Sequence, residues 1–300
     1  MTFQEKIQNC IPDKNIELGI SVHHIESGEE TNINAHAIFP TASVFKVPVM
    51  VEVYKQAREG KFDLGDRLGL KTKDKTLTTG VLLTLQDGLM LTIRDLMMLM
   101  TIVSDNTATT MLMDLVGAQN TTDTMRSLGL DTINVVMTVH EMFLYAFGIP
   151  EQNDINLEDL RVRAKEVQMD YNSRTFSRGI DNNVSSALDM TRLMAMIFKG
   201  EVVDREACDE MLKILQNQQY NSRVPRYLPW RSVYHKTGTM RGLRNDSGII
   251  TCKNNSHAAF TVYSFDQTTL PLGDFEVGEQ RSSLAEKMMA DIGRTIYEHY

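Results

Sequence analysis

Ser43 and Lys46 stand three residues apart in the segment Ser43-Val44-Phe45-Lys46, at the start of an expected helix. On a helix, side chains three positions apart lie one above the other on the same face. A serine hydroxyl attacks poorly until a neighbouring base takes its proton. A lysine can be that base once burial or another cation lowers its pKa. The helix N-terminus also favours the negative charge that develops during the attack. The pair therefore predicts nucleophilic catalysis by Ser43.

Two rarer motifs stand further along the chain. Residues 104–106 read Ser-Asp-Asn and residues 236–238 read Lys-Thr-Gly, which adds a second hydroxyl, an amide and a second amine. A serine followed three residues later by a lysine is expected by chance about 0.75 times in a chain of this composition. On its own the pair is therefore weak evidence for a site. All three motifs in this order are expected only about 0.003 times. We therefore interpret them as parts of one site.

The elements that must position these motifs are strands at both ends of the chain and helices in the middle. Short segments separated by turns that contain Gly, Ser or Asn predict strands over 16–25, 31–39, 232–236, 247–253 and 257–265. Helical spacing of apolar residues predicts helices over 44–58, 96–103, 107–116 and 281–300. Because strands that follow one another usually neighbour in space, we expect one antiparallel sheet built from both termini.

The expected fold is therefore α+β with two lobes. Residues 1–40 and 220–300 would form the lobe with the antiparallel sheet, flanked by helices, and residues 41–219 an all-helical lobe. Within the latter, residues 151–183 are rich in charged side chains and poor in large apolar ones. Two interpretations of this insertion stay open, a solvated surface segment and a lid over a site.

Composition and charge exclude several classes of protein. Hydrophobic residues make up 42% and charged residues 23%, which is typical of a soluble globular protein. The net charge of −8, with both signs interspersed, argues against nucleic acid or an anionic membrane as partner. The apolar-rich stretch 89–103 is too short to span a membrane. The three cysteines lack the spacing of a metal site, and the N-terminus lacks a signal pattern. Both features favour a cytoplasmic protein, or an exported one whose signal has been removed.

Together the three motifs resemble those of the active-site serine hydrolases that include class A β-lactamases and penicillin-binding proteins. The 61 residues between Ser43 and Ser104 also fit class A enzymes. The resemblance covers most of the chain and implies their two-lobed fold, with the active site between the lobes. It implies hydrolysis of a β-lactam amide in a small, anionic substrate, with no metal or cofactor.

The resemblance also implies a role for each residue that takes part in bond making. Ser43 would be the acylated nucleophile and Lys46 its proton partner, while Ser104 would relay the proton to the leaving nitrogen. Lys236 would keep Lys46 from being charged alongside it. The backbone N–H groups of Ser43 and Thr239 would form the oxyanion hole for the tetrahedral intermediate.

Other matching positions would bind the substrate. The resemblance implies that Asn106 holds the substrate's amide group and that Thr237 binds its carboxylate. Lys236 would attract an anionic substrate. Arg244, eight residues after Lys236, stands where many class A enzymes keep a carboxylate-binding arginine, and Arg241 is the alternative.

A fourth motif departs from the family pattern. Class A enzymes carry Glu-x-x-Leu-Asn on a loop, where the Glu activates the water that releases the acyl group. Here residues 141–145 read Glu-Met-Phe-Leu-Tyr, so Tyr145 replaces the Asn. Glu141 is expected either to be this base or to be an ordinary surface or helix-start residue. The replacement predicts fast acylation and slow deacylation.

Three functions are thus compatible with the sequence. The first is a β-lactam hydrolase that works through a Ser43 acyl-enzyme. The second is an enzyme with the same mechanism that acts on a peptide, amide or ester, including D-alanyl peptides, and the missing signal pattern favours it. The third is a penicillin-binding sensor that is acylated without turnover, which Tyr145 favours. The oligomeric state stays open.

Overall fold

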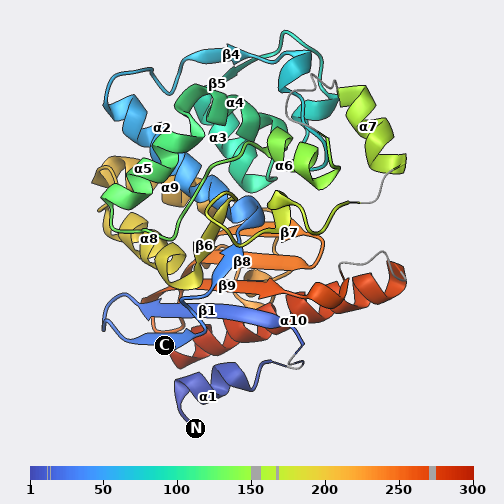
Figure 1. Ribbon diagram of the computed structural model, residues 1–300. Coiled ribbons are helices and arrows are strands. Elements are labelled where there is room, and N and C mark those ends of the chain that lie inside the picture. Colours follow the sequence, from blue (N-terminus) through green and yellow to red (C-terminus); the bar gives the residue numbers. More distant parts are fainter. Residues whose placement is uncertain (12, 14, 150–156, 167–168, 270–274) are drawn as a thin grey trace.

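The protein is built around a five-stranded antiparallel sheet with the strand order β2-β1-β9-β8-β7 (Figure 1). The computed structural model describes residues 1–11, 13, 15–149, 157–166, 169–269 and 275–300. The strands are β1 (Glu17–His24), β2 (Glu30–Ile33), β7 (Val233–Met240), β8 (Leu243–Thr251) and β9 (His257–Phe265). Strand β1 pairs with β9, so the two ends of the chain share one sheet, which confirms the expected α+β fold.

Helices cover both faces of this sheet. Successive side chains of a strand point to opposite faces. Ile249 accordingly belongs to the core that contains α8 (Ala187–Lys199) and α9 (Arg205–Gln216). Its neighbour Ile250 belongs to a second core, with α1 (Phe3–Gln8) and α10 (Phe275–His299). Helices on both faces explain why most residues of β8 and β9 are buried, rather than every second one.

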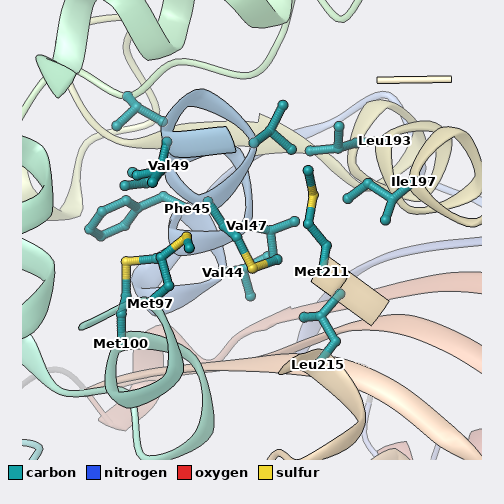
Figure 2. Packing of buried hydrophobic residues seen from close by; sticks show 14 of the residues in the cluster. Val44, Phe45, Val47, Val49, Met97, Met100, Leu193, Ile197, Met211 and Leu215 are labelled. Carbon is teal, nitrogen blue, oxygen red and sulfur yellow. The ribbon is translucent and has the colours of Figure 1, made fainter. Parts of the chain in front are cut away.

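Helix α2 (Lys46–Arg58) runs through the centre of the helical half of the molecule. Its residues are buried on nearly every side, which is the pattern of a core helix. Figure 2 shows Phe45 and Val47 packed with Met97 and Met100 of α3 (Ile93–Ile102). Met211 of α9 closes the other side of this cluster. The core fixes the start of α2 at Lys46 and the 3₁₀ turn before it, which contains Ser43.

The remaining elements form smaller units around the helical half. They are β3 (Ile38–Pro40) paired with β6 (Val184–Ser186), β4 (Arg67–Gly69) paired with β5 (Met90–Thr92), and the helices α4 (Asn106–Val116), α5 (Ala118–Ser127), α6 (Val139–Ala146) and α7 (Leu157–Glu166). Part of the charged segment 151–183, namely 151–156 and 167–168, lies outside the described residues. In the described ranges, no helix has both the length and the apolar character needed to cross a membrane.

Three expected elements have other bounds in the structure, since β7 runs on to Met240, β8 begins at Leu243 and α10 begins at Phe275. Two further elements differ in kind. The strand expected over 31–39 is split into β2 and β3, because Asn34 adopts a left-handed backbone with φ of 49° and turns the chain. The helix expected over 44–58 begins with a 3₁₀ turn, Ala42–Phe45, before α2 starts at Lys46. Such turns are frequent at the ends of α-helices.

Candidate active site

Ser43 lies in the 3₁₀ turn before α2, and hydrogen bonds from two sides hold that turn. The side-chain amide of Asn245 on β8 donates to the carbonyl of Thr41 over 3.1 Å. The Thr41 N–H donates to the carbonyl of Asn183 over 3.0 Å. Ala42 has a φ of 45°, a left-handed conformation that costs energy in a non-glycine residue. The surroundings therefore impose the position of Ser43.

Strand β7 passes directly beside this turn, and Gly238 makes the approach possible. A Cβ atom at Gly238 would lie 2.5 Å from the carbonyl oxygen of Thr41. Only glycine allows a strand to come so close to another backbone. The approach brings Thr237 and Thr239, the neighbours of Gly238, to the cavity that contains Ser43.

Lys46 is fully buried and makes three hydrogen bonds through Nζ. It lies 2.9 Å from the carbonyl oxygen of Ser104, 3.0 Å from Ser104 Oγ and 2.8 Å from Asn106 Oδ1. Burial lowers the pKa of Lys46 to about 7, although the negative charge of Asp105 opposes the shift. Near neutral pH a large fraction of Lys46 is therefore an uncharged amine that can accept a proton.

Lys236 approaches the same hydroxyl from strand β7. Its Nζ atom lies 3.1 Å from Ser104 Oγ and 2.9 Å from the carbonyl of the following residue. Burial holds the pKa of Lys236 well below its usual value, and the charges of Lys46 and Arg223 lower it further, while Asp246 opposes them. The structure thus brings two buried amines to one hydroxyl.

A cavity of about 780 Å³ opens in front of these groups. Its walls include most of the residues expected from the sequence, namely Ser43, Ser104, Asn106, Thr237, Thr239, Arg241 and Arg244. Lys46 and Lys236 lie behind this wall and are reached through Ser104. Eight of the nine expected site residues therefore gather at the cavity or directly behind it, together with Arg241.

Glu141 is the expected site residue that the structure does not bring there. It is the third residue of α6 and accepts hydrogen bonds from the N–H and hydroxyl of Thr138, while its own N–H donates to Thr138 Oγ1. This reciprocal pair is a capping box. Glu141 is absent from the described cavity lining, whereas Val139, Met142 and Phe143 of the same helix form part of it. Of the two interpretations, the structure places Glu141 as a helix-start residue.

Tyr145 also points elsewhere. Its hydroxyl accepts a hydrogen bond from Arg174 over 2.7 Å, and the guanidinium carbon lies 4.9 Å from the centre of the Tyr145 ring. Tyr145 is absent from the described cavity lining as well. The phenol therefore ties α6 to the segment that follows α7, rather than holding a water beside Ser43.

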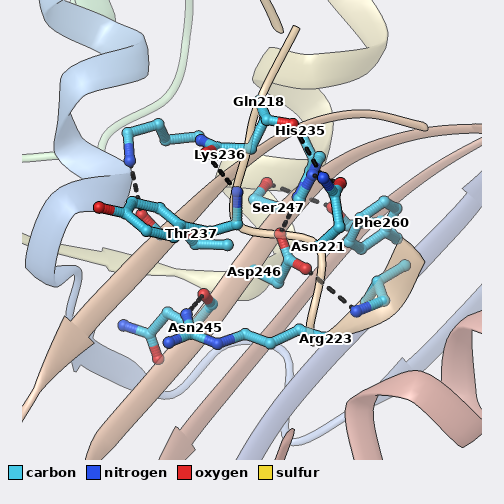
Figure 3. A network of polar contacts seen from close by, with 12 residues as sticks. Gln218, Asn221, Arg223, His235, Lys236, Thr237, Asn245, Asp246, Ser247 and Phe260 are labelled. Atoms are coloured by element: carbon cyan, nitrogen blue, oxygen red, sulfur yellow. Dashed lines mark hydrogen bonds and ion pairs between the residues drawn. The ribbon is translucent and has the colours of Figure 1, made fainter. Parts of the chain in front are cut away.

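Sequence reasoning missed Arg223, which is buried beneath β7 and β8 (Figure 3). It donates to the carbonyls of Gly238 and Asn245 over 2.9 and 2.6 Å, and to Thr239 Oγ1 over 2.5 Å. Oε1 of Glu286 on α10 lies 3.4 Å from Arg223 Nε. An isolated arginine between two expected elements carries no sequence signal that would identify it.

The segment that carries Arg223 is itself fixed by a buried pair. His235 Nδ1 lies 2.8 Å from Asp246 Oδ1, and the other carboxylate oxygen accepts from the Val224 N–H over 3.2 Å. Figure 3 shows Asn221 on the far side of the same imidazole, where its Oδ1 lies 3.3 Å from Nε2. These contacts hold Arg223 against the strands that line the cavity.

Comparison with known proteins agrees with this geometry. The sequence pattern described as the beta-lactamase enzyme family matches residues 2–300. The chain belongs to this family. Beta-lactamase VEB-1 of Pseudomonas aeruginosa is 22% identical over 317 residues, which cover 98% of this chain and 89% of that protein. As a member of the beta-lactamase family, the chain is a serine hydrolase of the metal-independent type.

Several solved structures share the fold. A β-lactamase from Sphaerobacter thermophilus is 28% identical, with a TM-score of 0.73 over 98% of this chain and 94% of that one. The L158E mutant of PBP-A, solved as an acyl-enzyme complex with penicillin G, is 21% identical, with a TM-score of 0.75 and the same coverage.

Proposed function

We propose that this beta-lactamase family member opens β-lactam rings by acylating Ser43, with uncharged Lys46 as the base. Ser43 Oγ bonds to the lactam carbonyl carbon and its proton passes to Lys46. Ser104 then gives its proton to the ring nitrogen as the carbon–nitrogen bond breaks, and takes a proton back from Lys46. The observation that carries this proposal is the position of Ser104 Oγ, 3.0 Å from Lys46 Nζ and 3.1 Å from Lys236 Nζ.

The other wall of the cavity supplies the charges that hold an anionic substrate. Thr237 and Arg244 line it, and Lys236 lies directly behind. Charge-assisted hydrogen bonds to a carboxylate are among the strongest in proteins. The backbone N–H groups of Ser43 and Thr239 receive the developing negative oxygen, in the role of an oxyanion hole.

A stopped-flow experiment with a chromogenic cephalosporin tests the proposal. Wild-type protein should release chromophore in a burst of about one equivalent, followed by a much slower steady rate, because deacylation needs a positioned base. A Ser43→Ala variant should show neither phase. A burst of unchanged amplitude in this variant would exclude Ser43 as the nucleophile.

A second candidate function is a penicillin-binding protein that is acylated and does not turn over. One observation favours it. The carboxylates among the described residues that line the cavity are Glu279 and Glu286, and both belong to α10. Glu141, the expected base, faces away. Following the acyl-enzyme by intact mass over hours separates the two functions, because an adduct that persists without product release indicates a sensor, and one that decays indicates a hydrolase.

A further inference from the structure

The side-chain amide of Asn106, at the start of α4, already makes hydrogen bonds through both of its polar atoms. Its Oδ1 atom accepts from Lys46 Nζ over 2.8 Å. Its Nδ2 atom donates to the carbonyl of Leu77 over 2.9 Å and to Thr78 Oγ1 over 2.8 Å. A carbonyl oxygen can only accept, so the contact with Leu77 identifies the nitrogen side of the amide. Both N–H bonds of Asn106 are therefore used within the protein.

A substrate carbonyl can reach Asn106 only by displacing one of these two acceptors. The main chain beside Leu77 is held, because the carbonyl of Thr79 accepts from the backbone N–H of Asn106 over 3.0 Å. The hydroxyl of Thr79 also donates to the carbonyl of Ser104 over 2.8 Å. The hydroxyl of Thr78 can instead leave by rotation about a single side-chain bond. Thr78 is exposed and lines the cavity, so it is the acceptor that a substrate displaces.

The backbone that carries Thr78 is strained and is held by the loop that contains Ser104. Thr78 has a φ of 83° and Ser104 a φ of 55°. A positive φ is an outlier for a β-branched residue. The carboxylate of Asp105 fixes the chain just after Thr78, since its Oδ2 accepts from the N–H groups of Val81 and Leu82 over 2.6 and 2.9 Å. Strained residues that their surroundings over-determine in this way cluster at functional sites.

We propose that Thr78 determines substrate specificity, because its hydroxyl occupies the place on Asn106 that the side-chain amide carbonyl of a β-lactam needs. The inference rests on the proposed acylation of Ser43. A β-lactam with such an amide must first move the hydroxyl away, and it exchanges one hydrogen bond of Asn106 for another. A β-lactam without the amide leaves the contact between Thr78 and Asn106 intact. The protein therefore gains little from an amide on its substrate, and β-lactams that lack one belong to its substrate class.

Thr78→Val tests this inference, because valine keeps the branched shape of threonine and removes the hydroxyl that accepts from Asn106. The second-order rate constant of acylation is measured with penicillin G, which carries a side-chain amide, and with sulbactam, which carries none. The variant should react about threefold to tenfold faster than wild type with penicillin G, which is the range for one hydrogen bond, and within about twofold of wild type with sulbactam. A slower reaction with penicillin G would overturn the inference, because Thr78 would then donate to the substrate amide instead of competing with it.

Thr78→Ser is the matched comparison, because serine keeps the hydroxyl and loses only the methyl group. It should not show the gain with penicillin G. The same gain in Thr78→Ser and Thr78→Val would overturn the inference, since relief of crowding would then explain it. Unchanged rate constants in Thr78→Val would also overturn it, while leaving the acylation of Ser43 intact. Absence of an adduct with both β-lactams in the wild-type protein would contradict the proposed function and this inference with it.

Discussion

The side-chain oxygen of Ser104 lies 3.0 Å from the Nζ atom of Lys46. Lys46 also donates to two oxygens that can only accept, the carbonyl of Ser104 and Oδ1 of Asn106. An uncharged amine has two N–H bonds and one lone pair. These two acceptors therefore take both N–H bonds, and the lone pair remains for a hydroxyl proton. The hydrogen bonds around Lys46 fit a base as well as they fit a cation.

The first prediction concerns pH. Because the pKa of Lys46 is lowered to about 7, the ammonium form predominates below that pH and has no lone pair for the Ser43 proton. The acylation rate constant should therefore fall about tenfold per pH unit below 7 and level off above it. Stopped-flow acylation by penicillin G from about pH 5.5 to about pH 9 measures this profile. A flat profile would assign the base to another group.

The second prediction concerns the cationic wall. Arg244→Ala should lower the second-order rate constant of acylation by penicillins by about tenfold or more, because a charge-assisted contact to the carboxylate is lost. The methyl esters of the same penicillins should lose much less. Arg226→Ala is a matched control, since Arg226 is exposed and lies outside the described cavity lining. Equal losses for acid and ester would mean that Arg244 does not bind the carboxylate.

The third prediction concerns Glu286, whose Oε1 lies 3.4 Å from Arg223 Nε and 3.5 Å from Arg244 Nε. This carboxylate partly neutralises the guanidinium groups that would bind the carboxylate of an anionic substrate. Glu286→Gln should therefore raise the acylation efficiency for penicillins by about threefold to fivefold, a size typical of a partly exposed ion pair. Efficiency for the methyl esters should not change. A loss similar to that of Arg244→Ala would show instead that Glu286 positions the arginines.

The fourth prediction concerns Glu141. Its carboxylate caps α6 and faces away from the cavity, so Glu141→Gln should leave the acyl-enzyme lifetime unchanged within about twofold, since glutamine also serves in a capping box. Thr138→Ala removes the same cap and should lower the free energy of unfolding by about 1 kcal/mol. Decay of the mass adduct on Ser43 measures the lifetime. A tenfold longer lifetime in Glu141→Gln would restore Glu141 as the deacylating base.

Much of the fold could be predicted from local patterns. Strand β9 is apolar along most of its length, and Thr92 and Asp95 form a capping box at the start of α3. Patterns of this kind can be recognised locally, because the burial of each strand or helix determines the spacing of apolar residues within that element. One sheet built from both termini was expected, but the pairing of β1 with β9 was not, because the rule that consecutive strands pair does not join distant strands. His24 and Ser256, the residue before β9, meet although they lie 232 positions apart.

The site was predictable only where short motifs carry it. Ser43, Lys46 and Lys236 stand in motifs, whereas Arg223 and Glu286 meet through tertiary contacts between residues 63 positions apart. For Glu141 the sequence left two roles open, because its distance along the chain from Ser104 says nothing about the face of a helix. The apolar spacing of Val139, Met142 and Phe143 could have indicated that face, but the motif match drew attention to the acid instead.

The most direct test of the whole account is the site of covalent attachment of penicillin G. After brief incubation, intact mass and peptide mapping should show one penicilloyl group, attached to Ser43. Ser104→Ala should form the same adduct at Ser43, only more slowly, and Ser43→Ala should form none. An adduct of normal yield in the Ser43→Ala variant, or one mapped to Ser104 in the wild-type protein, would contradict the account.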